Sequence, residues 1–363
     1  MKLFYLPLEP YVERYTYLMS SKNGWAETHF KNRDINFERI DGEQLGNTIN
    51  VGAVVDAFGR NYYSMTQVCK VIKKIKDGEI TDGDVIYTED FWHCGIEALF
   101  YIRHLTGINF KIGCFLHAQS VDDSDFTYSM RDWMRPIEQA YGKGYDYIFV
   151  TSEILRKLCI ENGIGGHNIY NVGLPYNSAR LKEQLQEMGF KTCEKEDYVI
   201  FSSRFDDEKD PMFFLDLVEK CPDIQFKLVK PRKVLTHNKL VENRLDDILK
   251  KQNNLELIDT SNKLDYYTAL AKAKVQFNCA IQDWVSWTLL EAVTFKCNPL
   301  YPIWKDFPIE LHNDSRFLYE RKNLEDCESR LRKLLTAEFD EDLNYVVEKH
   351  DNSWNKYLDI MEV

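Results

Sequence analysis

The sequence predicts an α/β protein made of two doubly wound, Rossmann-like domains. Short apolar runs rich in β-branched and aromatic residues alternate with helical patterns along the whole chain of 363 residues. This alternation is typical of a parallel sheet covered by helices. The runs fall into two sets of about six, which predicts two sheets rather than one. A chain of this length also suits two hydrophobic cores better than one.

Each expected element is a run of residues that the pattern separates from its neighbours. The first set of strands is expected at 2–6, 36–40, 84–88, 110–116, 146–151 and 168–172. The second set is expected at 197–202, 225–229, 255–258, 274–278, 297–301 and 316–319. Helical patterns lie between the strands, at 64–77, 94–105, 129–142, 152–163, 178–189, 211–220, 264–272 and 286–295.

The domain boundary is expected where a polar run interrupts the alternation. The segment KTCEKED follows the helical pattern at 178–189 and precedes a new strand. We therefore expect an N-terminal domain at 1–190 and a C-terminal domain at 191–345. The tail SWNKYLDIMEV is aromatic and amphipathic. Residues 346–363 are expected to include a helix that packs back on the N-terminal domain or caps the domain before it.

The composition is that of a folded, soluble chain, with 44% hydrophobic and 29% charged residues. No apolar run approaches the roughly 20 residues that span a bilayer, so no stable membrane insertion is expected. The start MKLFYLPLEPYVERY has early proline and glutamate, unlike a signal peptide. We therefore expect a cytoplasmic protein whose nine cysteines are reduced thiols. They form no C-x-x-C pair, so no zinc site is predicted.

The net charge of −12 argues against a general basic surface for nucleic acid. It does not exclude a local basic cleft. Residues 103–111 and 227–251 are less acidic than the rest of the chain. The alternative is that most of their lysines lie on a solvent-exposed face.

A candidate phosphate site follows the first strand of the second half. In open α/β sheets, ligands bind beyond the carboxyl ends of the strands. Arg204 and Lys209 lie in the loop after that strand, and Pro211 suits the first turn of the next helix. Two cations beside a helix N-terminus favour a phosphate. The acids at 206–208 oppose this field and are also the usual acids of a helix start.

Two acids interrupt the apolar stretch DWVSWTLLEAVTFKCNPLYP. Asp283 lies before a helix expected to begin near Ser286, and Glu291 lies inside it. A buried glutamate is costly unless it accepts hydrogen bonds, and a ribose diol offers two donors. Asp283 is placed to meet hydroxyls of a second moiety. The alternative is that Glu291 pairs with a nearby lysine or arginine.

The first half offers three further candidates. His117 ends the strand at 110–116, where it could bind substrate or act as acid or base, or be satisfied within its loop. The run VDDSDF holds an Asp-x-Asp pair, Asp123 and Asp125, that could bind a metal but suits a helix cap better. Glu89, Asp90 and His93 follow another strand and could bind an acceptor or cap the next helix.

These features, taken in chain order, resemble the retaining, nucleotide-sugar-dependent GT-B glycosyltransferases. The pair Arg204 and Lys209 is similar to the R-x4-K diphosphate clamp of that family. Asp283 and Glu291 are similar to its E-x7-E motif, and NVGLPYNSARL to its interdomain linker. His117 occupies the place of the family's histidine after a strand of the N-terminal domain. The resemblance extends over the whole chain and implies a donor site in the cleft between two domains. The domain at 1–190 would be on the acceptor side, and the domain at 191–345 would bind the nucleotide sugar.

The sequence departs from the family pattern at three places. Asp283 stands where the first Glu is usual, which shortens the reach to the sugar. Cys297 or Asn298 stands where a glycine is expected, and LPLEPYVERYT replaces the Gly-rich loop after the first strand. The strand end FLHAQS resembles that of a bacteriophage DNA glucosyltransferase of the same fold.

The resemblance implies a role for each candidate. Arg204 and Lys209 would stabilise the diphosphate leaving group, so that no metal or other cofactor is required. Glu291 would hold the ribose and Asp283 the sugar hydroxyls, while His117 would contact the transferred sugar as a third catalytic residue. The donor, a nucleotide sugar such as a UDP-sugar, would also meet Ser286, Trp287, Thr288 and Leu289. The acceptor would meet Arg14, Glu89, Asp90 and His93.

Several functions remain open at this point. The acceptor could be a hydroxymethylated pyrimidine in phage DNA, which would place the enzyme in the host cytoplasm, or a lipid-linked or surface glycan. A nucleotide-sugar epimerase of the same fold would act on the donor without an acceptor. An inactive binding module is the third reading, favoured by the altered first acid and the missing Gly-rich loop. The oligomeric state is not predicted.

Overall fold

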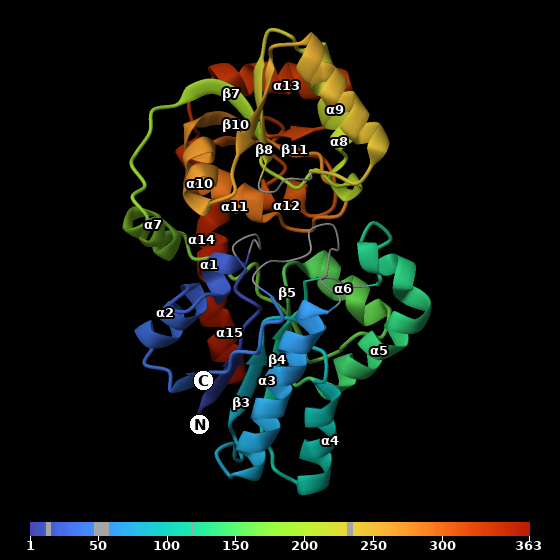
Figure 1. Cartoon of the computed structure of the whole chain (residues 1–363), viewed down its shortest axis with the longest axis vertical. Coiled ribbons are helices and arrows are strands. Elements are labelled where there is room, and N and C mark those ends of the chain that lie inside the picture. Colours follow the sequence, from blue (N-terminus) through green and yellow to red (C-terminus); the bar gives the residue numbers. More distant parts are fainter. Residues whose placement is uncertain (12–15, 47–57, 118–119, 231–234) are drawn as a thin grey trace. The chain divides into compact units, whose positions relative to one another are not determined.

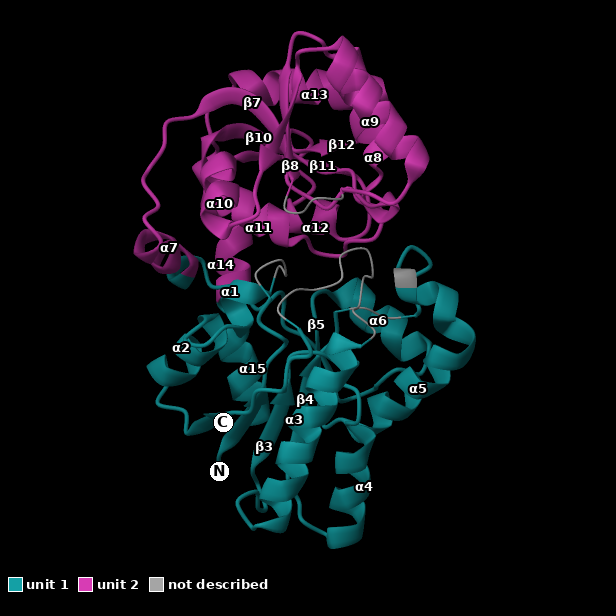
Figure 2. Cartoon of the chain, in the orientation of Figure 1, with its two compact units in different colours: residues 1–180, 352–363 teal, residues 181–351 magenta. Residues whose placement is uncertain are grey.

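The computed structural model describes residues 1–11, 16–46, 58–117, 120–230 and 235–363. The chain divides into two compact units (Figure 2). The first contains residues 1–180 and 352–363, and the second contains residues 181–351. The chain therefore passes from one unit to the other at 180/181 and returns at 351/352.

The N-terminal unit is built on a six-stranded sheet in the order β2-β1-β3-β4-β5-β6. All of its strand pairs are parallel. The chain runs from β1 outward to β2 and then crosses back to β3, so a topological switch point lies between β1 and β3. The strands are β1 (Leu3–Leu6), β2 (Phe37–Arg39), β3 (Val85–Thr88), β4 (Lys111–Phe115), β5 (Tyr147–Val150) and β6 (Ile169–Asn171).

Strand burial explains the apolar runs of this unit. Every residue of β1 and β3 is buried, because helices cover both faces of a parallel sheet and leave no polar side. The helical elements of the unit are drawn in Figure 1. They are α1 (Tyr17–Ser20), α2 (Trp25–Asn32), α3 (Gly59–Lys76), α4 (Glu97–Thr106), the 3₁₀ helix η1 (Phe126–Met130), α5 (Arg131–Gly144), α6 (Glu153–Glu161) and α15 (Ser353–Met361).

The C-terminal helix α15 belongs to the N-terminal unit. Trp354 is fully buried, and its indole Nε1 donates to the carbonyl of Pro175 at 3.1 Å. The Ser353 hydroxyl donates to the carbonyl of Val172 at 2.6 Å. The aromatic ring of Tyr357 lies 4.4 Å from that of Phe149 on β5, centroid to centroid. The aromatic residues of the tail thus complete the core of the first unit.

The C-terminal unit has a second parallel sheet of six strands, in the order β12-β11-β10-β7-β8-β9. Its switch point lies between β7 and β10, which are paired in parallel. The strands are β7 (Glu196–Phe201), β8 (Gln225–Lys230), β9 (Leu255–Asp259), β10 (Ala273–Phe277), β11 (Asn298–Pro302) and β12 (Leu318–Tyr319).

Helices connect the strands of this sheet, and α7 spans the passage between the units. Asparagine N-caps start three of them, since the side chains of Asn238, Asn262 and Asn323 accept from main-chain amides of the first turn. The helical elements are α7 (Ser178–Glu187), η2 (Asp207–Lys209), α8 (Pro211–Lys220), α9 (Lys239–Lys251), α10 (Lys263–Lys272), α11 (Trp287–Thr294), α12 (Phe307–Glu310), α13 (Leu324–Thr336), η3 (Glu341–Leu343) and α14 (Asn344–Asp351).

The predicted fold class is confirmed: each unit is a doubly wound parallel sheet, and all twelve expected strands are present within one or two residues of their expected bounds. The structure adds several helices to those expected from the pattern, among them α2, α9 and α13. In the described part of the chain, no helix combines the length and apolar character that crossing a bilayer requires.

Candidate donor site at the second switch point

The candidate phosphate-binding lysine lies at the switch point of the second sheet. Lys209 ends η2, just beyond β7, and its ammonium group forms an ion pair with Asp283, which follows β10. These residues are 74 positions apart. The side chain of Lys209 is only 8% exposed, and that of Asp283 18%. A buried cation and a half-buried carboxylate therefore meet where a doubly wound sheet binds its ligands.

Arg204 lies in the same loop but faces acids of its own segment. Its guanidinium forms ion pairs with Glu208 and, at 3.2 Å, with Asp206. The side chain is 39% exposed. Two of the three acids expected to oppose a phosphate, Asp206 and Glu208, are thus direct partners of this arginine, and an incoming anion would compete with them.

The two loops are fixed to each other by the main chain. The amide of Ile281 donates to the carbonyl of Glu208 at 3.0 Å, and the thiol of Cys279 lies 3.2 Å from the carbonyl of Lys209. The indole Nε1 of Trp304 donates to the carbonyl of Ile281 at 2.7 Å. The loops that carry Lys209 and Asp283 are therefore joined by hydrogen bonds and do not move independently.

Glu291 is buried in α11 and accepts from two tyrosines. The hydroxyls of Tyr266 and Tyr267, adjacent residues of α10, donate to its two carboxylate oxygens at 2.6 and 2.7 Å. Burial raises the pKa of Glu291, and the two phenol donors act in the opposite direction. Its hydrogen-bond donors are thus tyrosines, while the charge of Lys263 also acts on Glu291 and lowers its pKa. The tyrosine pair was missed, although the doublet in LDYYTAL was its one signal.

Three hydroxyls form a hydrogen-bonded chain at the start of α11. The Ser286 hydroxyl is 2.9 Å from that of Thr288, which is 3.0 Å from the phenol of Tyr301 on β11. Leu289 is fully buried, and its amide donates to the carbonyl of Ser286 at 3.1 Å. Trp287 opens the helix and is half-buried. Of the four residues expected at the donor, Ser286 and Thr288 thus carry side-chain hydroxyls into one hydrogen-bonded network.

Glu89 lies at the switch point of the first sheet, between β1 and β3. It follows β3 and accepts from the hydroxyls of Tyr5 and Ser20, and from the amide of Leu8 at 2.8 Å. Only 1% of it is exposed, and burial raises its pKa. Because three donors already hold this carboxylate, its geometry is that of a group that fixes the loop after β1.

The other candidates of this unit surround a buried arginine. Arg60 forms ion pairs with Asp90 at 2.9 Å and with Glu9 at 3.1 Å. Burial opposes ionisation of Asp90, but Arg60 and His117 together lower its pKa. Burial lowers the pKa of His93 to about 3, so this ring is neutral. Asp90 is the half-buried member of the group, while His93 is almost fully enclosed.

His117 is half-buried beyond β4, and its Nε2 donates to the carbonyl of Glu89 at 2.8 Å. This contact fixes the ring beside Asp90.

Arg14 lies outside the described residues. The Asp-x-Asp pair includes a helix cap, since Asp125 accepts from the amide of Thr127 at 2.9 Å at the start of η1. Among the described residues, no group of three or more His, Cys, Asp or Glu side chains is placed to hold a metal.

Comparisons with known proteins give matches in structure alone. No protein-family model and no curated protein matches the sequence. Sucrose-phosphate synthase from Thermosynechococcus elongatus matches with a TM-score of 0.63 at 11% identity, covering 99% of this chain and 95% of that one. A glycosyltransferase from Rickettsia africae ESF-5 matches with a TM-score of 0.59 at 14% identity, covering 99% and 97%.

A third structure holds ligands. Anabaena HepE in complex with UDP and glucose matches with a TM-score of 0.58 at 12% identity, covering 99% of this chain and 95% of that one. Identities this low establish a common fold and leave the reaction open. The two doubly wound units of this chain are those of the GT-B glycosyltransferase fold.

Proposed function

We propose that this protein is a glycosyltransferase that moves a sugar from a nucleotide-sugar donor to an acceptor hydroxyl. The observation that carries the proposal is the meeting of Lys209 and Asp283 beyond β7 and β10, with Glu291 buried in the following helix. The cation is Lys209, and the two carboxylates are Asp283 and Glu291. All three come from segments that follow β7 or β10 in the second sheet. A nucleotide sugar offers a diphosphate, a sugar and a ribose diol to these three groups. UDP is the proposed nucleotide, since a structural match contains it.

Lys209 is proposed to bind the diphosphate and stabilise it as it leaves. Charge grows on the diphosphate as the glycosidic bond breaks, and a preorganised cation in a partly buried site stabilises that charge strongly. The ammonium is paired with Asp283 in the structure. Donor binding would let the diphosphate share the cation, while Asp283 turns to sugar hydroxyls. Arg204 is proposed as the second cation, so that the cations supply what a metal would otherwise supply.

Glu291 is proposed to accept from the ribose hydroxyls. Each carboxylate oxygen has two lone-pair directions, so the bonds from Tyr266 and Tyr267 leave one acceptor site on each oxygen. The tyrosines would hold the carboxylate in position and limit the cost of its burial. Ser286 and Thr288 would complete the polar edge between the ribose and the sugar.

The finer chemistry is proposed from the same residues. Retention of anomeric configuration by front-face attack is the expected course, with His117 contacting the transferred sugar. On the acceptor side, Asp90 and His117 are the half-buried pair, while Glu89 and His93 are proposed to support them from within the fold. Arg14 remains a proposed acceptor contact.

For the acceptor, the proposal is a hydroxymethylated pyrimidine in DNA, supported by the resemblance of the strand end at His117. The net charge of −12 works against it, because nucleic-acid affinity rests largely on cations that neutralise phosphates. Donor turnover should therefore be compared with hydroxymethylcytosine DNA, hydroxymethyluracil DNA and a glycan panel. Transfer to glycans alone would overturn the DNA acceptor. Donor inversion without any acceptor would identify an epimerase.

Donor binding can be tested by thermal unfolding. A ligand that binds only the folded state raises the unfolding temperature with its concentration. UDP-, GDP- and ADP-sugars should be screened separately, and we expect the UDP-sugars to stabilise the protein. No shift with any of the three would contradict the proposed function. A shift without turnover for every acceptor would leave an inactive binding module.

Removing one phenol should move the pH dependence of nucleotide binding. Burial raises the pKa of Glu291 and the tyrosines partly offset this rise. Ribose binding uses the carboxylate, so affinity should fall as the pH drops through this raised pKa. Tyr267→Phe removes a donor that lowers the pKa and should therefore move the fall in affinity to higher pH.

The measurement is nucleotide affinity by titration calorimetry between about pH 5 and about pH 9. The control is Tyr170→Phe, because Tyr170 lies on β6 in the other unit. An unchanged pH profile in Tyr267→Phe, with binding intact, would show that Glu291 does not bind the ribose as a carboxylate.

A further inference from the structure

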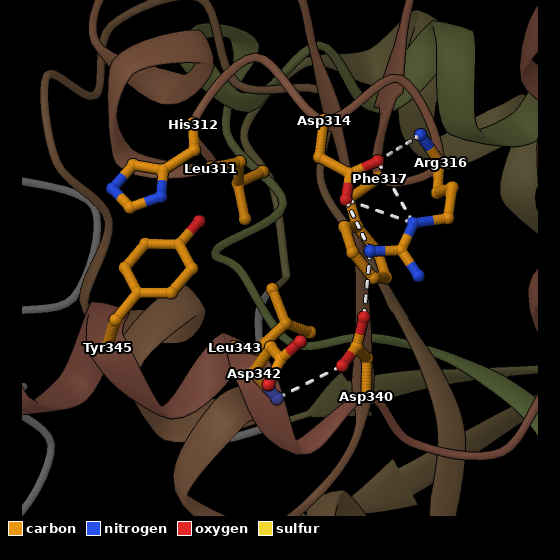
Figure 3. A pocket seen from close by; sticks show the side chains of 9 residues that line it. All are labelled: Leu311, His312, Asp314, Arg316, Phe317, Asp340, Asp342, Leu343 and Tyr345. Atoms are coloured by element: carbon orange, nitrogen blue, oxygen red, sulfur yellow. Dashed lines mark hydrogen bonds and ion pairs between the residues drawn. The ribbon is translucent and has the colours of Figure 1, made fainter.

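The C-terminal unit contains a cavity that the donor site does not use. Its volume is about 400 Å³, and Figure 3 shows its lining. Phe317 directly precedes β12, which is parallel to β11. The cavity is therefore at the amino edge of this sheet, whereas Lys209 and Asp283 lie beyond the carboxyl ends of its strands. It is a separate site by topology. Its lining residues are Leu311, His312, Asp314, Arg316, Phe317, Asp340, Asp342, Leu343 and Tyr345.

One side of the cavity is aromatic. The imidazole of His312 lies parallel to the ring of Tyr345, with centroids 3.8 Å apart and planes at 5°. His312 and Asn313 both have positive φ angles, 49° and 57°, a conformation that residues other than glycine adopt at some cost. Two consecutive residues of this kind turn the chain so that the imidazole stands over the phenol ring. Such strained backbone is concentrated at functional sites.

The opposite side is polar and carries both signs of charge (Figure 3). Arg316 bridges two carboxylates, with N–O distances of 2.5 Å to Asp314 and 2.7 Å to Asp340. The amide of Asp342 donates to Asp340 at 3.0 Å. These bonds fix the orientation of the Arg316 guanidinium and of the Asp314 and Asp340 carboxylates. Within the described residues, the carboxylate of Asp342 and the hydroxyl of Tyr345 have no hydrogen-bond partner.

The lining chemistry limits the class of ligand. Three carboxylates against one guanidinium disfavour an anion, and the polar wall disfavours a purely apolar ligand. A simple cation would gain from the carboxylates but would face the guanidinium of Arg316. A sugar fits all of the walls, because its hydroxyls both donate and accept while its C–H face packs on an aromatic ring. Leu311, Phe317 and Leu343 add apolar surface for that face. A volume of this order is typical of small-molecule sites.

We propose that this cavity is a saccharide-binding site, separate from the donor site and selective for a neutral sugar over an ion. The rings of His312 and Tyr345 bound the site on one side, and Asp342 accepts from the hydroxyls of the sugar. Arg316 holds Asp314 and Asp340 in place and donates to ring or hydroxyl oxygens. A glycosyltransferase could use such a site to hold a second part of a glycan. The binding itself does not depend on the proposed transfer.

The test is a titration of the full chain with methyl glycosides of glucose, galactose, mannose and N-acetylglucosamine, followed by saturation-transfer NMR. We expect saturable binding of at least one glycoside, with a dissociation constant on the order of 1 mM. Tyr345→Ala should weaken it about tenfold, since aromatic contacts contribute on this scale. Asp342→Asn should also weaken it. The Asp342 carboxylate has no hydrogen-bond partner among the described residues, so Asp342→Asn should leave the protein folded. It therefore tests the site even if Tyr345→Ala, which removes a packed ring, unfolds the protein.

Two controls separate this site from the others. Tyr101→Ala removes an exposed tyrosine of α4 in the other unit and should leave glycoside binding unchanged. Lys209→Ala impairs the proposed donor site and should also leave it unchanged, so a failure of the donor proposal is recognised independently.

Two outcomes would overturn the proposal. The first is no saturable binding of any of the four glycosides; if L-arginine then binds saturably, the cavity is a site for basic groups. The second is binding that Lys209→Ala abolishes and Tyr345→Ala does not, which would place the sugar in the donor site.

Discussion

Lys209→Ala is expected to abolish sugar transfer while leaving the protein folded. The lysine is the buried cation of the proposed donor site, and residues 202–210 contain no other lysine. Removing one preorganised group that stabilises developing negative charge typically lowers the rate by about 10² to 10³. We expect at least this loss in kcat, together with weaker binding of the nucleotide diphosphate. Arg204→Ala should abolish transfer as well.

The measurement is donor turnover at saturating acceptor, with nucleotide affinity measured in parallel. Lys220→Ala is the matched control, because Lys220 forms ion pairs with Glu325 and Glu328 at the far end of α8. It removes a paired lysine of the same unit and should leave turnover unchanged. Thermal unfolding must show that Lys209→Ala remains folded, since the substitution leaves Asp283 without this partner. Near-normal turnover in either Lys209→Ala or Arg204→Ala would refute the diphosphate assignment.

The fold could be predicted because its signals are local and repeated. A strand buried on both faces has to be apolar throughout, so runs such as LFYL and YIFV mark β1 and β5 directly. The domain boundary was less accurate. The structure divides the chain at 180/181, whereas the polar run suggested 190/191. The helix α7 spans that passage, and a sequence pattern does not tell to which unit an amphipathic helix contributes its contacts.

The site could be predicted only where it depends on position relative to a strand. Lys209 and Asp283 each follow a strand, and the pairing of β7 with β10 brings them together. The partners of Glu291 depend instead on how α10 packs beside α11, which no residue spacing encodes. In the same way, the ion pairs of Arg60 with Glu9 and Asp90 join three separate segments. The cavity at Tyr345 also requires tertiary packing, because its lining comes from the α12–β12 connection and the segment from Asp340 to Tyr345.

The aromatic tail is expected to be essential for the stability of the N-terminal unit. Trp354 is fully buried among aromatic residues, with ring centroids 5.6 Å from Phe30 on α2 and 5.2 Å from Tyr357. Its indole also donates to the carbonyl of Pro175. Trp354→Ala would remove this packing and leave that carbonyl without its donor. Replacing a buried tryptophan with alanine typically lowers the free energy of unfolding by about 3–5 kcal/mol.

Because the chain has two units, one melting temperature would not resolve this effect. Native-state hydrogen exchange separates them, since the core amides of each sheet report the opening of their own unit. In Trp354→Ala, protection should fall for β1 and β3 and stay unchanged for β7 and β10. Trp133→Ala, on α5 of the same unit, removes a tryptophan that is 55% exposed and should change protection by no more than about 0.5 kcal/mol. Equal losses in the two variants would mean that the C-terminal helix is not part of the N-terminal core. The chain's return at 351/352 would then contribute nothing to the stability of the unit that carries His117 and Asp90.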